Sequence, residues 1–260
     1  MEVARLKLFI WRTLPTQCAI RSMTGTFKIP VTRSPGFDPK PVARRLVETK
    51  TTWAHDRTLP VSRPLSRLKQ ENADENRPAL PPGQSIVTRL PVLDLGYRPL
   101  LSHSDWSLLI GGLCRHRTRL SFDDLEKLGP VETRQNVHCV TGWSQLDVGW
   151  TGIPASRILD LAQPVSRAHY AILRSFDGYG TSMLLSDLRR DGVIFATHLE
   201  GRPLPRNHGG PVRLVTPHLY FWKSAKWVKQ IWFTDQDPGG YWENRGYHHR
   251  GDPWKQQRFR

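Results

Sequence analysis

The sequence has little of what a disulfide-rich secreted protein or an integral membrane protein needs. Its 260 residues contain only three cysteines, Cys18, Cys114 and Cys139, which are too few for a disulfide framework. No two of them form the Cys-x2-Cys pair that is typical of structural zinc sites. No stretch approaches the ~18–20 consecutive apolar residues of a membrane-spanning helix. The sequence therefore predicts a protein of a reducing compartment without a membrane span.

The first twenty residues also lack a clear export signal. Arg5, Lys7 and Arg12 interrupt the short apolar runs, and no twin arginine precedes an apolar stretch. An amphipathic transit peptide is the alternative interpretation of this segment. We expect a cytoplasmic protein.

Acidic and apolar residues are both scarce. The chain has 23 Asp and Glu against 38 Lys and Arg, a net charge of +15, and only 38% of its residues are hydrophobic. Residues 1–80 hold 15 basic and 7 acidic residues together with eight prolines, and no apolar period persists there beyond one helical turn. Such a composition is typical of segments that cannot bury a core. We predict that residues 1–80 form a disordered basic arm.

A folded domain is predicted over residues 81–260, because eight of the ten tryptophans lie there. Apolar runs bounded by Gly, Pro or Asp predict strands at 106–113, 168–176, 212–215 and 227–233. Ser121, with Asp124 three residues later, predicts a helix N-cap, and Pro154 predicts the first position of a second helix. Strands and short helices do not alternate in a regular βαβ order. We therefore expect a single α+β domain with a mixed β-sheet.

Cys139 lies in the most unusual segment, residues 136–143 with the sequence NVHCVTGW. It follows an alternating run, directly after His138, and Gly142 predicts a turn next to it. A lone cysteine is most often an inert, buried, small apolar residue. A thiolate at a strand end among cationic groups would instead be a nucleophile or a soft-metal ligand. The residues alone leave both interpretations open.

A second unusual segment, residues 201–226, combines glycines and prolines with basic side chains. They include Arg202, Arg206, His208, Arg213, Lys223 and Lys226. Backbone amides, guanidinium groups and ammonium groups in such a loop can bind an anion. The chain lacks both the P-loop pattern and the dinucleotide-binding glycine pattern, so nucleotide folds of those types are disfavoured. A solvated basic hairpin is the alternative.

Three segments of the sequence resemble one known family. They are NVHCVTGWSQLDVGWTGIP, THLEGRPLPRNHGGPVRLVTPHLYFWKSAKWVKQI and DPGGYWENRGYHHRGDPWKQQRF. In this order they closely resemble the molybdopterin-binding domain of the sulfite oxidase superfamily, and specifically the bacterial sulfite oxidase-like oxidoreductases. The likeness covers residues 81–259 and implies the mixed sheet of that domain. It also implies a molybdenum ion on a single pyranopterin and two-electron oxygen-atom transfer on a small oxyanion or an S- or N-oxide. No haem is expected, because the predicted arm has no spacing of paired histidines that would hold one.

The resemblance implies roles for particular residues. Cys139 matches the thiolate ligand of molybdenum, and Asp177 resembles an acidic residue on the substrate side. The matches to cofactor-binding positions are Ser175 against the cofactor, His208 and Arg213 at the pterin phosphate, and Ser224, Ala225 and Lys226 at a second phosphate and pterin contact.

Candidates outside those matches are Arg174 and Arg206 for selecting an anionic substrate, and Tyr241 and Trp242 for the pocket rim. The partners implied are a small-molecule substrate and an unidentified electron donor or acceptor protein. Several matched residues have simpler interpretations. His208 could be a turn residue, Lys226 could cover a neighbouring tryptophan, and Ser175 could satisfy a strand end.

Two other functions compete with the enzyme. A pI of about 10.3 and many aromatics are typical of nucleic-acid binders. More than half of the excess charge lies in the predicted arm, however, and no helix-turn-helix, RNA-recognition or zinc-knuckle pattern occurs. A zinc site could draw on Cys114, His116, His138, Cys139 or the pair His248 and His249. Their spacings do not match structural zinc sites.

Overall fold

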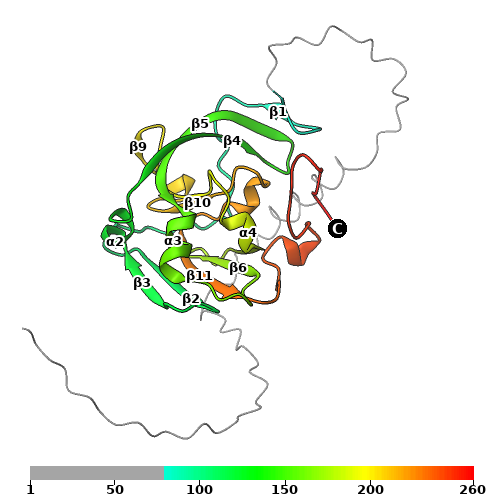
Figure 1. The fold of residues 1–260 in the computed structure, drawn as a ribbon. Coiled ribbons are helices and arrows are strands. Elements are labelled where there is room, and N and C mark those ends of the chain that lie inside the picture. The colour runs from blue at the N-terminus through cyan, green and yellow to red at the C-terminus, as the bar shows by residue number, and fades with distance from the viewer. Residues whose placement is uncertain (1–78) are drawn as a thin grey trace, which may run out of the picture. The chain divides into compact units, whose positions relative to one another are not determined.

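Two mixed β-sheets make up most of the regular structure in residues 79–260, the part of the chain that the computed structural model describes (Figure 1). The predicted disordered arm, residues 1–80, lies outside the described residues except for its last two positions. None of the described helices is both long and apolar enough to span a membrane. Mixed sheets with few helices confirm the predicted α+β class, with two sheets where the sequence analysis expected one.

The first sheet carries the long hairpin that ends at Cys139. Its strands are β1 (Ser85–Ile86), β4 (Val131–His138), β5 (Trp143–Pro154), β8 (Ile194–Leu199), β9 (Arg202–Pro203) and β10 (Arg213–Val215). The order is β1-β5-β8-β10, with β4 also paired to β5 and β9 to β8. Only the β1–β5 pair is parallel.

The second sheet has the order β3-β2-β11-β6-β7. Its strands are β2 (Ser107–Gly112), β3 (Thr118–Ser121), β6 (Tyr170–Ser175), β7 (Gly180–Leu184) and β11 (Val228–Thr234). β11 runs parallel to β2, and the other pairs are antiparallel. Strands β2, β6, β10 and β11 confirm the four predicted strands. The sequence analysis did not predict β4, β5, β7 or β8.

Short helices connect the strands. They are α2 (Phe122–Glu126), α3 (Ala155–Ala162), α4 (Leu185–Leu188) and the 3-10 helices η2 (Arg206–His208), η3 (Phe221–Lys223) and η4 (Glu243–Arg245). α2 begins as predicted, because Ser121 and Asp124 form a reciprocal capping box. The position predicted for Pro154 is wrong by one residue. Pro154 still pairs with Ile194 in the first sheet, and its extended backbone makes it the N-cap of α3.

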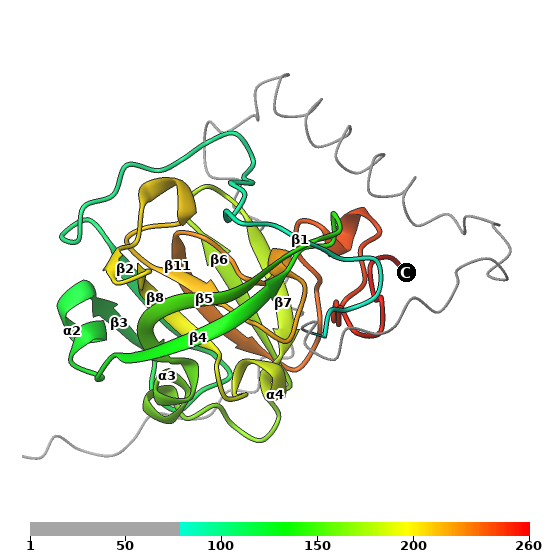
Figure 2. The ribbon, with the colours of Figure 1, turned by 90° about the horizontal axis from the view of Figure 1, so that it is seen from above.

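The main core lies between the two sheets and α3. Buried side chains from both sheets belong to one apolar cluster, among them Ile110 and Ile231 from the second sheet and Phe195 and Leu214 from the first. α3 packs its buried residues into the same cluster. Figures 1 and 2 show β4 and β5 crossing over the second sheet, with α3 closing one end. This packing fixes the ends of β4, β6 and β10 relative to one another.

Gly152 permits the closest approach between β5 and β8. A Cβ at this position would lie 2.2 Å from the Phe195 carbonyl oxygen and 2.5 Å from the Ala196 Cα. Both are backbone atoms, which cannot move aside as the end of a side chain can. We predict that Gly152→Ala lowers the free energy of unfolding by about 2 kcal/mol or more, measured by urea denaturation.

The matched control is Gly180→Ala in β7, where the nearest atom to an added Cβ is the Leu173 carbonyl oxygen at 3.4 Å. This variant should change stability by less than about 1 kcal/mol. Equal effects of the two substitutions would contradict the close approach at Gly152.

Candidate functional site

Cys139 lies in the turn that joins β4 to β5. Its backbone N–H donates to the Trp143 carbonyl over 2.8 Å, and the Gly142 N–H donates to the Cys139 carbonyl over 3.0 Å. Gly142 has a φ of 91°, a conformation that favours glycine, so the turn predicted from this residue is present. The side chain of Cys139 is buried and lines a cavity.

Distant parts of the domain hold this turn in place. Gln84 Nε2 donates to the Cys139 carbonyl over 3.1 Å, and Arg258 Nη1 donates to the Val140 carbonyl over 2.7 Å. Thr141 Oγ1 donates to Cys139 Sγ over 3.2 Å. Contacts from both ends of the described region therefore determine where the sulfur atom lies.

The cavity brings together five of the eight residues predicted for the site. They are Cys139, Asp177, Arg213, Ser224 and Lys226. They come from the β4–β5 turn, the β6–β7 turn, strand β10 and the segment after η3. The irregular segment 91–95 and the C-terminal segment complete the wall with residues that include Asp94, Trp242 and Tyr247.

Arg213 and Lys226 place positive charge in this cavity, with Arg213 buried and Lys226 half-buried. Arg213 is 1% exposed, and its guanidinium donates to the carbonyls of His208 over 2.9 Å and Ser224 over 3.0 Å. Lys226 donates to the Asn207 carbonyl over 2.7 Å. Neither side chain forms an ion pair with an acidic residue of the described region.

This burial has a clear electrostatic effect. Desolvation lowers the pKa of Arg213 to about 9. Desolvation, followed by the charge of Arg213, lowers the pKa of Lys226 to about 7. Asp94 lines the same cavity, but its carboxylate is paired with Arg98 at 2.7 Å. Buried cations without a carboxylate partner are costly, so the site favours binding of an anion.

Three predicted residues lie outside the cavity lining. His208 Nδ1 and Ser175 Oγ are buried and have no hydrogen-bond partner within the described region. Burial, with the charges of Arg213 and Lys226, lowers the pKa of His208 to about 4. Ala225 packs into the main core, and its backbone bonds to Lys223 and Leu214. Two of the three therefore have polar atoms that a ligand could satisfy.

Asp177 lies in the turn between β6 and β7 and is 5% exposed. It accepts a hydrogen bond from the Tyr179 N–H over 3.0 Å. Desolvation raises the pKa of Asp177 to about 6. Its carboxyl group therefore exchanges its proton close to neutral pH, inside the same cavity as Cys139.

The two arginines considered for substrate selection do not line the cavity. Arg174 is on the exposed face of β6, between buried Leu173 and buried Ser175, because strand side chains alternate. Arg206 is exposed and donates to the carbonyls of Pro99 and Arg98. Of the two rim candidates, Trp242 lines the cavity and Tyr241 does not.

Sequence reasoning missed most of the aromatic and polar wall. It consists of Thr141, Trp143, Tyr179, Phe221, Trp222, Trp227 and Tyr247. Trp222 and Trp242 both pack against Tyr247, and their ring centroids lie 5.2 Å and 4.8 Å from the centroid of the Tyr247 ring, respectively. The high tryptophan content was the only signal, and it does not say which rings face a cavity.

The histidines and cysteines considered for zinc have separate contacts. His138 Nδ1 lies 2.7 Å from Ser144 Oγ, and burial lowers the pKa of His138 to about 4. His249 Nδ1 lies 2.6 Å from a carboxylate oxygen of Asp237. Cys114 faces the His116 carbonyl. Within residues 79–260, no three His, Cys, Asp or Glu side chains form a group that could hold a metal ion.

Comparison with known proteins identifies the family. The model of the oxidoreductase molybdopterin-binding domain matches residues 96–242, more than half of the chain. This protein belongs to that family. It is a molybdopterin-dependent oxidoreductase, and the match confirms the resemblance to the molybdopterin-binding domain of the sulfite oxidase superfamily. The matched range includes all eight predicted site residues.

Related proteins support the assignment to the molybdopterin-binding family. The chain is 43% identical to the uncharacterized oxidoreductase YuiH of Bacillus subtilis (strain 168) over 181 residues, which are 69% of this chain and 91% of that protein. It is 32% identical over 160 residues to the protein-methionine-sulfoxide reductase catalytic subunit MsrP of Xanthomonas campestris pv. campestris, covering 55% of this chain and 49% of that subunit. This chain therefore spans about half the length of MsrP.

A solved structure shares the fold. The sulfane dehydrogenase SoxCD from Paracoccus pantotrophus matches with a TM-score of 0.50 and 23% sequence identity, over 54% of this chain and 41% of that chain. At this identity the likeness shows the fold alone.

The residues of the cavity fit a molybdopterin cofactor. A thiol is the kind of ligand that a soft metal centre takes. Arg213 and Lys226 supply positive charge for a phosphate group, and His208 and Ser175 offer buried polar atoms without partners. The donor set thus matches both the metal and the anionic part of the cofactor.

A buried polar network supports the aromatic wall of the cavity. Lys223 and Glu243 form an ion pair in which both side chains are 0% exposed. Thr181 Oγ1 also donates to Glu243 over 2.7 Å, and Trp222 Nε1 donates to the same carboxylate over 3.4 Å. Trp222 lines the cavity, so Glu243 links the wall to strand β7.

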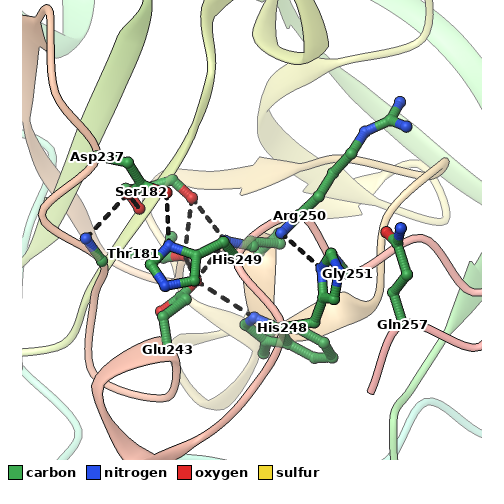
Figure 3. A network of polar contacts seen from close by, with 12 residues as sticks. Thr181, Ser182, Asp237, Glu243, His248, His249, Arg250, Gly251 and Gln257 are labelled. Carbon is green, nitrogen blue, oxygen red and sulfur yellow. Dashed lines mark hydrogen bonds and ion pairs between the residues drawn. The ribbon is translucent and has the colours of Figure 1, made fainter. Parts of the chain in front are cut away.

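The network continues toward the surface in the C-terminal segment. Figure 3 shows Asp237 between Ser182 of β7 and His249. The Gly239 N–H also donates to Asp237 over 2.9 Å. These contacts attach the segment that carries Trp242 and Tyr247 to the second sheet.

We predict that Glu243→Gln lowers the free energy of unfolding by about 3 kcal/mol, because it leaves the charge of Lys223 buried without its carboxylate. Urea denaturation measures the change. The matched control is Glu132→Gln at an exposed position of β4, which should have an effect below about 0.5 kcal/mol. A Glu243→Gln variant as stable as this control would show that the ion pair does not support the wall.

Proposed function

We propose that the protein catalyses two-electron oxygen-atom transfer on a small oxyanion or an S- or N-oxide, with Cys139 as the thiolate ligand of molybdenum. One observation carries the proposal. The buried Arg213 and the half-buried Lys226 form no ion pair with an acidic residue of the described region, and they share a cavity with the Cys139 thiol. That combination suits a soft metal whose organic carrier bears a negative charge.

In this proposal, the basic residues hold the cofactor. Arg213 and His208 bind the pterin phosphate, and Ser224, Ala225 and Lys226 form the second contact. Ser175 supplies a further hydroxyl. A bound phosphate would raise the pKa values of Lys226 and Arg213 again, because it offsets the cost of burying their charges. Ala225 contributes by its core packing, which holds Ser224 and Lys226 at the cavity.

When bound, the molybdenum centre would supply oxygen-atom exchange between substrate and water, with the accompanying two electrons passing between the substrate and the electron donor or acceptor protein. Asp177 is the residue best placed to take up or release a proton, because it lines the cavity and its pKa is about 6. The aromatic wall excludes water from the site.

The substrate class rests on two supports. The methionine-sulfoxide reductase relatives favour an S-oxide, and aromatic rings make favourable contacts with the thioether sulfur that reduction of such a substrate would leave. Trp143, Trp242 and Tyr247 would provide those rings on the side of Cys139. An electron donor or acceptor protein completes the cycle.

Metal and pterin analysis of the purified protein tests the proposal. We expect about one molybdenum per chain, retained through desalting. Cys139→Ser should keep the fold and the pterin but reduce turnover of sulfoxides, N-oxides or sulfite with artificial electron donors or acceptors by more than about 100-fold. Even substitutions of residues that contact only the metal ligands typically lower metal affinity or activity by about 10–100-fold.

Cys114→Ser is the control, because Cys114 lies outside the cavity lining. It should retain full activity. Stoichiometric zinc without molybdenum, or wild-type turnover in Cys139→Ser, would refute the proposal.

Removing a phosphate-binding cation should weaken retention of the cofactor. We predict that Arg213→Ala lowers the molybdenum and pterin content after desalting, with binding weaker by about ten-fold or more, because a hydrogen bond to a charged group contributes about 1.5–3 kcal/mol. Lys226→Met should act in the same direction. Arg174→Ala, on the exposed face of β6, is the control and should retain the cofactor. Unchanged molybdenum content in both cavity variants would exclude the phosphate-binding role.

A further inference from the structure

The side-chain hydroxyl of Thr141 donates a hydrogen bond to the sulfur of Cys139. Its Oγ1 lies 3.2 Å from Cys139 Sγ, and both residues line the cavity. None of the residues matched to the sulfite oxidase superfamily is Thr141. The proposed ligand role of Cys139 does not account for this hydrogen bond.

The hydroxyl is held in place by the rigidity of the turn. The Cys139 carbonyl accepts from Gln84 Nε2 and from the Gly142 N–H, over 3.1 and 3.0 Å. The next carbonyl, of Val140, accepts from Arg258 over 2.7 Å. These bonds leave the backbone on both sides of Val140 little freedom, so the geometry between Thr141 and the sulfur is built into the fold.

A hydrogen bond to a thiolate withdraws negative charge from the sulfur. Such bonds from outside the ligand shell tune metal–sulfur centres, and they raise reduction potentials because they stabilise the more electron-rich, reduced state. We infer that Thr141 is a positioning residue that lowers electron donation by the Cys139 sulfur and thereby raises the reduction potential of the molybdenum centre. This inference rests on the proposed ligand role of Cys139.

The alternative is that Thr141 only shapes the turn. The two roles differ in which substitutions are tolerated. Valine has nearly the shape of threonine but cannot donate a hydrogen bond, whereas serine keeps the donor and loses a methyl group. A structural role would tolerate valine at least as well as serine, while a tuning role requires the hydroxyl.

The test compares wild-type holoenzyme with Thr141→Val and Thr141→Ser. Each protein is assayed for molybdenum content, for the electron paramagnetic resonance spectrum of the Mo(V) state, and for the midpoint potential in a redox titration with mediators. We expect normal molybdenum content in both variants. Thr141→Val should lower the equilibrium constant for reduction by roughly five- to ten-fold and alter the spectrum, consistent with the loss of about 1 kcal/mol from one hydrogen bond. Thr141→Ser should match the wild type.

Two outcomes would overturn the inference. One is a wild-type potential in Thr141→Val at full molybdenum content, and the other is an equal shift in the valine and serine variants. If Thr141→Val fails to fold, Thr141→Ala removes the same donor and must show the same shift. Cys139→Ser separates the two proposals, because an unchanged Mo(V) spectrum in that variant would refute the ligand role itself, whatever the result at Thr141.

Discussion

The cost of burying positive charge without a negative partner is the constraint on which the site depends. Arg213 and Lys226 line one cavity, where both donate to backbone carbonyls and lie over aromatic rings. The carboxylates of Asp94 and Asp177 attract Lys226, but neither cation forms an ion pair with an acidic residue of the described region. Some buried charges elsewhere in the described region are paired, as Lys223 is with Glu243 and Asp187 is with Arg250. Arg213 has no such partner, so an anionic ligand bound in the cavity would offset the cost of burying its charge.

The two sheets supply the rigidity that such a site requires. Cys139 is presented by a hairpin turn of the first sheet, Asp177 by a turn of the second, and Arg213 by strand β10 of the first. Polar contacts from Gln84 and Arg258 brace the turn from both ends of the described region. Functional groups on loops that a rigid sheet supports keep their relative positions.

Local chemistry explains which predictions from the sequence succeeded. Ser121 and Asp124 form their capping box because the interaction spans only three residues, and Gly142 marks its turn because it adopts a left-handed backbone. Predictions that depended on the direction of a side chain or on the end of a strand failed more often. Arg174 faces solvent because strand alternation directs it away from the cavity, and Pro154 extends β5 because its partner Ile194 continues the ladder.

Residue motifs and local pattern were enough to indicate the family, the α+β class, four strands and the set of candidate ligands. Which of those candidates share a cavity was decided by tertiary structure, as was the wall built from Trp143, Trp242 and Tyr247. The hydrogen bond from Trp222 to Glu243 joins residues 21 positions apart in the sequence, and the one from Arg258 to Val140 joins residues 118 positions apart. Such contacts depend on how sheets pack, and packing sums weak interactions over the whole domain, so no single segment of sequence contains them.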